Sequence, residues 1–245
     1  MKMKDRILKT LTHKNTSLGN NIKSVGKLIL RNWGFEILRV PHYGKYYKRF
    51  RYFERIYDSI RSIDGNIVEC GVGKGNSFLT LVNLAADEDK GREIWGFDSF
   101  EGFPEPSVHD KSIRNIKKGD LNVSTPDSIK KFLTHKGGID SKFLNNHVKL
   151  IKGFFDESLK KYDGRPIAIL HLDVDMHDSY KDCLEQLWPY VAPGGVVLFD
   201  EYKTRAASTY WPGAAKAIDE FFKDKKVFIR KDNFPGRYYA FKEHD

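Results

Sequence analysis

The amino-acid sequence predicts an α/β fold built on one doubly wound, mostly parallel, seven-stranded sheet. Two observations carry this prediction. From residue 66 onward, short apolar runs alternate with helix-length amphipathic segments, which is typical of parallel strands joined by covering helices. The last two apolar runs are separated only by residues 231–236, a link too short for a helical crossover, so they should form an antiparallel C-terminal hairpin. We expect an N-terminal helical extension in front of this sheet.

The individual elements follow from the same periodicity. Five parallel strands are expected at residues 67–70, 93–97, 148–151, 167–172 and 196–199, and the hairpin strands at 227–230 and 237–242. Amphipathic helices are expected at residues 76–86, 126–135 and 180–190. The second of these helices is preceded by Thr125, a capping residue, and begins with Pro126, which is favoured in a first helical turn.

The first quarter of the chain has a different character. Residues 22–40 and 46–63 carry apolar side chains at three-to-four spacing and are expected to be helices. Residues 1–60 hold 14 Lys and Arg against 4 Asp and Glu, whereas residues 61–245 are nearly neutral, with 28 against 29. We therefore divide the chain into a basic N-terminal arm with helices, residues 1–63, and a main α/β domain, residues 64–245. The arm is expected to form a lid or to join two subunits in a homodimer.

The composition narrows the class of protein. The chain has 245 residues, 40% of them hydrophobic, which is enough for one large domain. No apolar run reaches the ~18 residues of a transmembrane helix, and the first 14 residues lack the apolar core of a secretory signal. Two cysteines, Cys70 and Cys183, exclude a disulfide scaffold. We expect a cytoplasmic protein. A nucleic-acid partner is not expected, because the basic residues do not surround the proposed site.

A glycine-rich loop follows the first strand and predicts a ligand site. Glu69 is followed by Gly71, Gly73 and Gly75, and the second strand ends at Asp98, whose carboxylate can accept both hydroxyls of a ribose. Three interpretations compete: a plain strand-to-helix turn, a nicotinamide dinucleotide site, and a site for S-adenosylmethionine (SAM). A dinucleotide site lacks its third glycine here, and Glu69 would repel a pyrophosphate. The cationic ammonium and sulfonium groups of SAM would suit Glu69, which favours SAM.

Acidic side chains follow the fourth and fifth strands. Asp173 and Asp175 come after one strand, and Asp200 and Glu201 after the next. Because adjacent parallel strands end side by side, these carboxylates should crowd one rim of the pocket and suit a hard cation such as Mg²⁺. The alternative is that they cap helices, and Asp175 is the strongest candidate for that role. His177 lies close by and is a candidate general base, or else ordinary polar surface.

Four blocks of sequence resemble the macrocin O-methyltransferase family. They are, in order, VECGV at 68–72, WGFDSFEGFP at 95–104, LHLDVD at 170–175 and GGVVLFDEY at 194–202. The resemblance covers about residues 46–245. It implies a class I methyltransferase, Rossmann-like fold and an enzyme that uses SAM and Mg²⁺ to methylate sugar hydroxyls on macrolides and other glycosylated natural products.

The resemblance also implies roles for individual residues. The cofactor-binding set it implies is Glu69, Gly71, Gly73 and Ser77 for the methionine end of SAM, Asp98 for the ribose, Ser99 near the adenosine, Gly153 and Phe154 beside the adenine, and Asp120 as a further candidate. The implied metal ligands are Asp173, Asp200 and Glu201. Asp173 would also accept the substrate proton, with His177 as the alternative base.

Two residues depart from the family pattern. Glu201 stands where the family usually has Asp, and His177 where it usually has Tyr. The resemblance implies a sugar hydroxyl of a glycan, a nucleotide sugar or a glycosylated small molecule as the acceptor. The departure at His177, beside the acceptor, leaves room for an acceptor different from those of the best-known members. Two alternatives stay open: a catechol-type O-methyltransferase acting on an aromatic diol, and a catalytically inactive interaction protein with a SAM-binding fold.

Overall fold

The computed structural model describes residues 43–233 and 236–243. The chain divides into two compact units, Met1–Gly44 and Lys45–Asp245, and the second holds all that is described below except the first two residues of one helix, Tyr43 and Gly44. The helix predicted at residues 22–40 and most of the basic arm lie outside the described residues. The lid or dimer role of the arm therefore stays a prediction.

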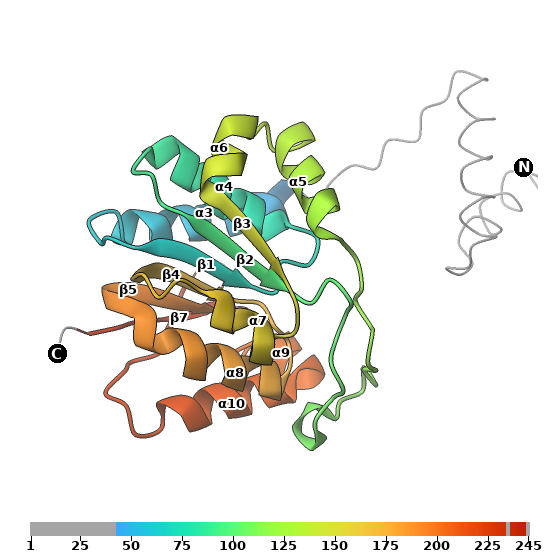
Figure 1. Ribbon diagram of the computed structural model, residues 1–245. Helices are drawn as coiled ribbons and strands as arrows, with labels where there is room; N and C mark the ends of the chain where they lie inside the picture. The colour runs from blue at the N-terminus through green and yellow to red at the C-terminus, as the bar shows by residue number, and fades with distance from the viewer. Residues whose placement is uncertain (1–42, 234–235, 244–245) are drawn as a thin grey trace, which may run out of the picture. The chain divides into compact units, whose positions relative to one another are not determined.

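Seven strands of the described part of the chain form one sheet, in the order β3-β2-β1-β4-β5-β7-β6 (Figure 1). Their bounds are β1 Asn66–Cys70, β2 Ile94–Asp98, β3 Val148–Lys152, β4 Ile167–Leu172, β5 Val191–Phe199, β6 Arg230–Lys231 and β7 Tyr238–Phe241. The first five are parallel, and β7 is antiparallel to both β5 and β6. The predicted fold class is confirmed.

The register brings three strand ends to one edge. Cys70 at the end of β1 lies opposite Phe97 of β2 on one side and Leu172 of β4 on the other. The strand order reverses between β1 and β4, which is the point where open α/β sheets bind their ligands. The side chains that follow these strands therefore lie close together at this edge of the sheet.

Helices cover both faces of the sheet (Figure 1). One face carries α3 (Tyr43–Ser59), α4 (Asn76–Glu88), α5 (Pro126–His135) and α6 (Ser141–His147). The other carries α7 (Phe155–Ser158), α8 (His177–Leu187) and α10 (Pro212–Phe222), with the short α9 (Arg205–Tyr210) before α10. As predicted, α5 begins at Pro126, and the hydroxyl of Thr125 accepts the N–H of Ser128 at 3.2 Å.

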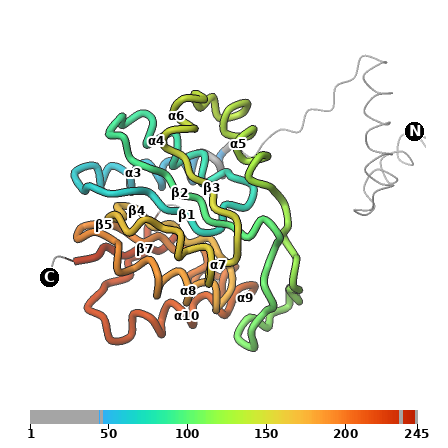
Figure 2. The backbone as a smooth tube through the Cα atoms, viewed as in Figure 1, coloured from blue at the N-terminus to red at the C-terminus, as the bar shows by residue number. Residues whose placement is uncertain are grey.

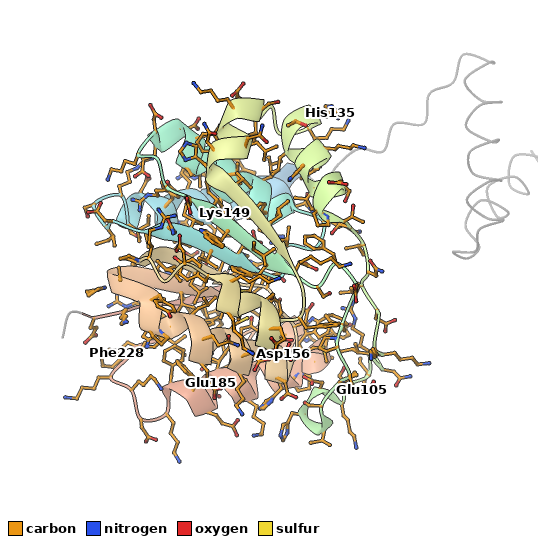
Figure 3. The ribbon with its side chains drawn as sticks, viewed as in Figure 1. Glu105, His135, Lys149, Asp156, Glu185 and Phe228 are labelled. Atoms are coloured by element: carbon orange, nitrogen blue, oxygen red, sulfur yellow. The ribbon has the colours of Figure 1, made fainter. Side chains whose placement is uncertain are left out.

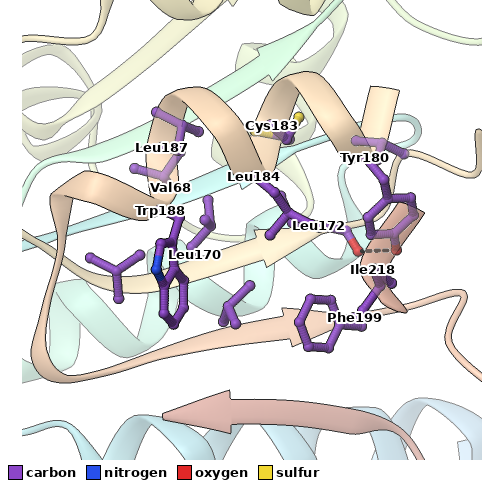
Figure 4. Close-up of a cluster of buried hydrophobic side chains, with 14 of the residues drawn as sticks. Val68, Leu170, Leu172, Tyr180, Cys183, Leu184, Leu187, Trp188, Phe199 and Ile218 are labelled. Atoms are coloured by element: carbon purple, nitrogen blue, oxygen red, sulfur yellow. Dashed lines mark hydrogen bonds between the residues drawn. The ribbon is translucent and has the colours of Figure 1, made fainter. Parts of the chain in front are cut away.

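The core consists of two apolar layers, one on each face. Neighbouring strand residues alternate between them: Ile67 and Ile169 face the α3–α4 layer, whereas Val68 and Leu170 face the α8–α10 layer, as the pleat of a strand requires. Figure 4 shows the second layer, in which Leu170, Leu184 and Trp188 pack together. Two buried faces explain why these strands read as continuous apolar runs.

Four element predictions differ clearly from the structure, and one of them is the strand expected at 196–199, which as β5 already begins at Val191. The hairpin strand expected at 227–230 is only the two-residue β6, because Val227 and Ile229 pack against the α8–α10 layer instead of continuing the ladder. The helix expected at 46–63 is α3, which ends at Ser59 and packs on the sheet within the second unit. The helix expected at 180–190 is α8 and a following 3₁₀ turn, Trp188–Tyr190.

A long loop joins β2 to α5 and runs past α9 and α10 (Figure 2). Its one regular element is a 3₁₀ turn, Val108–Asp110. Asp110 is buried there, and its carboxylate accepts the backbone N–H of His177 at 2.8 Å and the N–H of Ser107 at 2.9 Å. The loop is thus tied to the first turn of α8.

Candidate active site

A cavity of about 550 Å³ lies at the edge of the sheet where β1, β2 and β4 end. Its wall comes from Arg49 of α3, the glycine loop, the long loop after β2, the start of α7 and the first turns of α8. Figure 3 labels two of its lining residues, Glu105 on the long loop and Asp156 on α7. Most of the predicted site residues lie in or directly behind this wall.

The glycine loop forms the wall next to β1. Gly71, Gly73 and Gly75 all have positive φ, at 86°, 52° and 79°. At Gly71 a side chain is excluded, because a Cβ would lie 1.9 Å from the backbone oxygen of Asp173. The loop therefore passes directly against the end of β4, and residues 71–74, 76 and 77 line the cavity at the N-terminus of α4.

Asp98 sits at the end of β2 and lines the cavity. One carboxylate oxygen accepts the N–H of Gly73 at 2.8 Å, and the other accepts the N–H of Phe100 at 2.7 Å. Each oxygen keeps a lone pair for a further donor. The neighbouring Ser99 also lines the cavity, and its hydroxyl donates to the carbonyl of Gly102 at 2.6 Å. This arrangement suits a ligand with two adjacent hydroxyls.

Glu69 lies behind the cavity wall and is fully buried. One carboxylate oxygen accepts the hydroxyl of Ser77 and lies 3.1 Å from Nδ1 of His171. The other, Oε2, is buried without a hydrogen-bond partner among the described residues. Ser77 lines the cavity, so Glu69 acts on the cavity through Ser77 and through its own charge.

Three other predicted binding residues differ in their placement. Phe154 lines the cavity. Gly153 is not part of the wall; its N–H donates to the carbonyl of Asp98 at 3.0 Å and so ties β3 to β2. Asp120 is exposed, and its carboxylate accepts the N–H of Lys117 at 2.9 Å within a turn. Its neighbours Lys118 and Leu121 face the cavity instead.

Three carboxylates gather on the far rim of the cavity. Asp173, Asp175 and Glu201 each place an oxygen within 4.8 Å of the others. Burial, followed by the charge of Asp173, raises the pKa of Asp175 well above its ordinary value. Burial, then Asp173 and Asp175, likewise raise the pKa of Glu201. The cluster is short of positive charge, and a hard cation would supply it.

This group of three carboxylates differs in one member from the set of metal ligands predicted from the sequence. Asp200 does not belong to the cluster; its carboxylate is ion-paired with Arg237 and lies 3.7 Å from Nε2 of His171. Asp175 takes its place. The expected capping role of Asp175 is not observed, because the residue before α8 is Met176 and that end has no side-chain cap. Asp175 has a left-handed backbone, with φ at 61°.

The structure turns His177 away from the cavity, contrary to its predicted role as a base. Its Nδ1 lies 2.7 Å from Asp178, and its Nε2 lies 3.3 Å from Glu220 of α10. The reason is helical geometry: successive residues of α8 point about 100° apart. The side chains that line the cavity from this helix are Asp178, Ser179 and Asp182.

Arg49 is a site residue that the sequence analysis missed. It lies on α3, lines the cavity and contacts Asp173, with 3.4 Å between Nη2 and Oδ2. In sequence it is one of many basic residues in the first quarter of the chain, and no local signal separates it from Lys48 or Arg51. Only the packing of α3 on the sheet brings it to the acid cluster.

The sheet order, the antiparallel final strands, the glycine loop after β1 and the acid at the end of β2 together define a class I methyltransferase fold. Among solved structures, that of a calicheamicin methyltransferase superposes with a TM-score of 0.69 at 22% identity, over 98% of this chain and 91% of that one. The sequence model of the macrocin-O-methyltransferase (TylF) family matches residues 19–231. The chain belongs to this family.

Two curated relatives are similar over part of the chain. The 8-demethyl-8-(2,3-dimethoxy-alpha-L-rhamnosyl)-tetracenomycin-C 4'-O-methyltransferase of Streptomyces olivaceus is 32% identical over 145 residues, 57% of this chain and 54% of that protein. The mycinamicin III 3''-O-methyltransferase of Micromonospora griseorubida is 25% identical over 144 residues, 57% of this chain and 56% of that protein. The chain thus matches a little over half the length of these relatives. No helix in the described part of the chain is long and apolar enough to cross a membrane.

Proposed function

We propose that this chain is a SAM-dependent O-methyltransferase that methylates a sugar hydroxyl of a glycan, a nucleotide sugar or a glycosylated small molecule. The observation that carries the proposal is the cavity at the reversal point of the sheet, where the glycine loop, Asp98 and the carboxylates of Asp173 and Asp175 face one space. Family membership supports it, as do the two relatives, since both are named as O-methyltransferases and one acts on a rhamnosyl-tetracenomycin.

The methyl donor would lie between the glycine loop and the end of β2. Asp98 would accept the ribose hydroxyls, and Ser99 and Phe154 would line the adenosine side. Glu69 would supply negative charge for the cationic methionine end, and its unpartnered buried oxygen supports this role. Gly71 and Gly73 would let the backbone approach the donor closely.

A divalent cation such as Mg²⁺ would be held by Asp173, Asp175 and Glu201. These carboxylates fit such an ion, because they offer only oxygen ligands, and the raised pKa values of Asp175 and Glu201 support a site that needs positive charge. When bound, SAM supplies an electrophilic methyl group and the cation lowers the pKa of a nearby hydroxyl. The chain itself must align the acceptor, exclude water and accept a proton.

We assign the role of proton acceptor to Asp173. It lines the cavity, and 27% of its side chain is exposed, so an acceptor hydroxyl can reach it. Its carboxylate would hydrogen-bond the hydroxyl and take its proton as the oxygen is methylated. His177 is not proposed as the base, because its ring is held between Asp178 and Glu220 outside the cavity wall.

The test is a methyl-transfer assay with SAM, Mg²⁺ and a panel of glycosides and nucleotide sugars, read by mass spectrometry. We expect methylation of at least one sugar, loss of the product in EDTA and recovery with Mg²⁺. Asp173→Asn should abolish the product, whereas the matched variant His177→Gln should keep most of it. Methylation of a catechol but of no sugar would favour the catechol-type alternative. No SAM binding by calorimetry would rule out the methyltransferase proposal and favour the interaction protein.

A cytoplasmic location, a homodimer and the absence of a nucleic-acid partner stay predictions. The two cysteines, Cys70 and Cys183, are free and buried, which is compatible with a reducing compartment. A gel-shift experiment with RNA and duplex DNA at physiological salt tests the last of these: a sub-micromolar, sequence-preferring complex would contradict it.

A further inference from the structure

We infer that Arg49 is a built-in countercharge for the acid cluster, and that it competes with the divalent cation for Asp173. The inference rests on the proposed function, since it needs the proposed cation site at Asp173, Asp175 and Glu201. It adds a means of regulating that site. In the cation-free state the guanidinium of Arg49 supplies the positive charge beside the carboxylates, and a cation must displace it in order to bind.

The contact of Arg49 with Asp173 is direct but slight. One guanidinium nitrogen, Nη2, lies 3.4 Å from one carboxylate oxygen, Oδ2. Both side chains are about one quarter exposed, at 25% and 27%, and both line the cavity. Arg49 therefore contacts a carboxylate of the acid cluster that faces the cavity and is partly open to solvent.

Arg49 is also held loosely on its other sides. Its Nε is buried and has no hydrogen-bond partner among the described residues. Its guanidinium lies 5.8 Å from the ring of Phe53, which makes only a weak cation–π contact. Further along the same helix, Arg55 makes a contrasting pair, with Nη2 at 2.9 Å and 2.8 Å from the two oxygens of Asp232. Arg49 contacts only one oxygen of Asp173, so its contact is weaker and easier for a cation to displace.

Two other arginines act on the cluster through their charge, but their direct contacts lie elsewhere. Arg237 is ion-paired with Asp200, outside the group of three carboxylates. Arg114 lowers the pKa of Asp175 from a distance, and its guanidinium lies 4.4 Å from the ring of Trp211. Arg49 thus pairs directly with this group of three, through Asp173.

A cation and a guanidinium cannot share Asp173 without repulsion. A divalent ion bound to an oxygen of Asp173 would lie a few ångströms from the guanidinium, where charges interact strongly near a protein surface. Binding of the ion must therefore push Arg49 away, and Arg49 must weaken binding of the ion. Once released, the guanidinium still faces the cavity, where its donors are available to the acceptor.

The experiment measures metal affinity directly, in the absence of SAM and acceptor. Mn²⁺ is titrated into the EDTA-treated full-length protein and its free concentration is read by electron paramagnetic resonance. The variants are Arg49→Gln, which removes the charge, Arg49→Lys, which keeps it, and Arg51→Gln as a matched control. Arg51 lies on the same helix and pairs with Glu54 at 3.2 Å, away from the cavity. Melting temperatures in EDTA are recorded for all four proteins.

Arg49→Gln should bind Mn²⁺ on the order of tenfold more tightly than the wild type, because the repulsion is gone. It should also melt at a lower temperature in EDTA, because three carboxylates then lack their countercharge. Arg49→Lys and Arg51→Gln should stay close to the wild type in both measurements. An unchanged or weaker Mn²⁺ affinity of Arg49→Gln, with binding retained by the wild type, would overturn the inference and leave the metal site standing. Absence of Mn²⁺ binding in all four proteins would overturn the metal site and the inference together, whereas the methyl-transfer assay would still decide the proposed activity.

Discussion

At the scale of single residues, Asp98 joins the glycine loop to the proposed donor site. Its carboxylate accepts backbone N–H groups from Gly73 and Phe100 and keeps acceptor capacity for the cavity. We expect Asp98→Ala to weaken binding of S-adenosylhomocysteine by ~1.5–3 kcal/mol, the usual value of hydrogen bonds to a charged group. Calorimetry measures this loss. Asp120→Ala is the matched control and should bind normally, because the Asp120 carboxylate lies in an exposed turn. Equal losses in both variants would contradict our placement of the donor.

Glu201 makes the stability of the metal-free protein depend on pH. Its pKa is raised in the folded state by burial and by Asp173 and Asp175, so the folded state holds a proton that the unfolded state has released. Stability therefore falls as the pH rises from the ordinary value of 4.5 through the raised pKa. In EDTA, Glu201→Gln should gain in melting temperature over the wild type as the pH increases from about 5 to about 8.

Two comparisons make this pH prediction specific to the acid cluster. Glu157→Gln should show no such trend, since Glu157 is exposed and pairs with Lys160. Saturating Mg²⁺ should favour the wild type, because the ion stabilises the charged form of Glu201 that the variant lacks. A constant difference between Glu201→Gln and the wild type at all pH values in EDTA would contradict the raised pKa.

At the scale of elements, the long loop after β2 is held by its packing against α8 and α10. Gly213 on α10 allows this approach, because a Cβ there would lie 2.1 Å from Oδ1 of Asp110 and 2.9 Å from Cβ of His177. We expect Gly213→Ala to destabilise the protein by ~1–3 kcal/mol in urea unfolding, the usual cost of overpacking. The same variant should weaken donor binding, since this loop supplies Phe103 and Glu105 to the cavity wall.

The matched variant for this element is Lys216→Ala, one turn further along α10 on its exposed side. Lys216→Ala should change the unfolding free energy much less than Gly213→Ala does, and it should leave the donor affinity unchanged. If Gly213→Ala proved as stable as Lys216→Ala, the close approach of Asp110 to α10 would not hold in solution.

At the scale of the whole molecule, the described site belongs to the second compact unit, Lys45–Asp245. Among the described residues, those that line the cavity all lie at Arg49 or beyond. We therefore expect deletion of residues 1–40 to leave the affinity for S-adenosylhomocysteine unchanged. A changed acceptor KM, or a change from dimer to monomer on size-exclusion chromatography, would support the lid or dimer role predicted for the basic arm. Loss of donor binding would show that the donor site needs residues before the second unit.

Much of the fold could be predicted from the sequence, because its signals are local. Apolar runs bounded by glycine and acidic residues marked the five parallel strands, and the short link at 231–236 marked the antiparallel end of the sheet. The glycine loop and Asp98 could be placed at one edge for the same reason, since parallel strands end together. The short helices α6, α7 and α9 carried too few residues for a periodic pattern and were not predicted, and the longer α10 was missed as well.

The sequence by itself determined the class of sheet, the location of the site at its carboxyl edge and the acidic, oxygen-rich character of that edge. Only the tertiary structure decided which side chains enter the site. Asp175 rather than Asp200 joins Asp173 and Glu201, because Arg237 arrives from beside β7 and pairs with Asp200. Arg49 reaches the cluster from a helix more than a hundred residues away in sequence. The physical reason is that the periodicity of a strand or helix depends on residues that are near one another in the sequence. A charged side chain instead pairs with any opposite charge that the packing of the chain brings within a few ångströms of it.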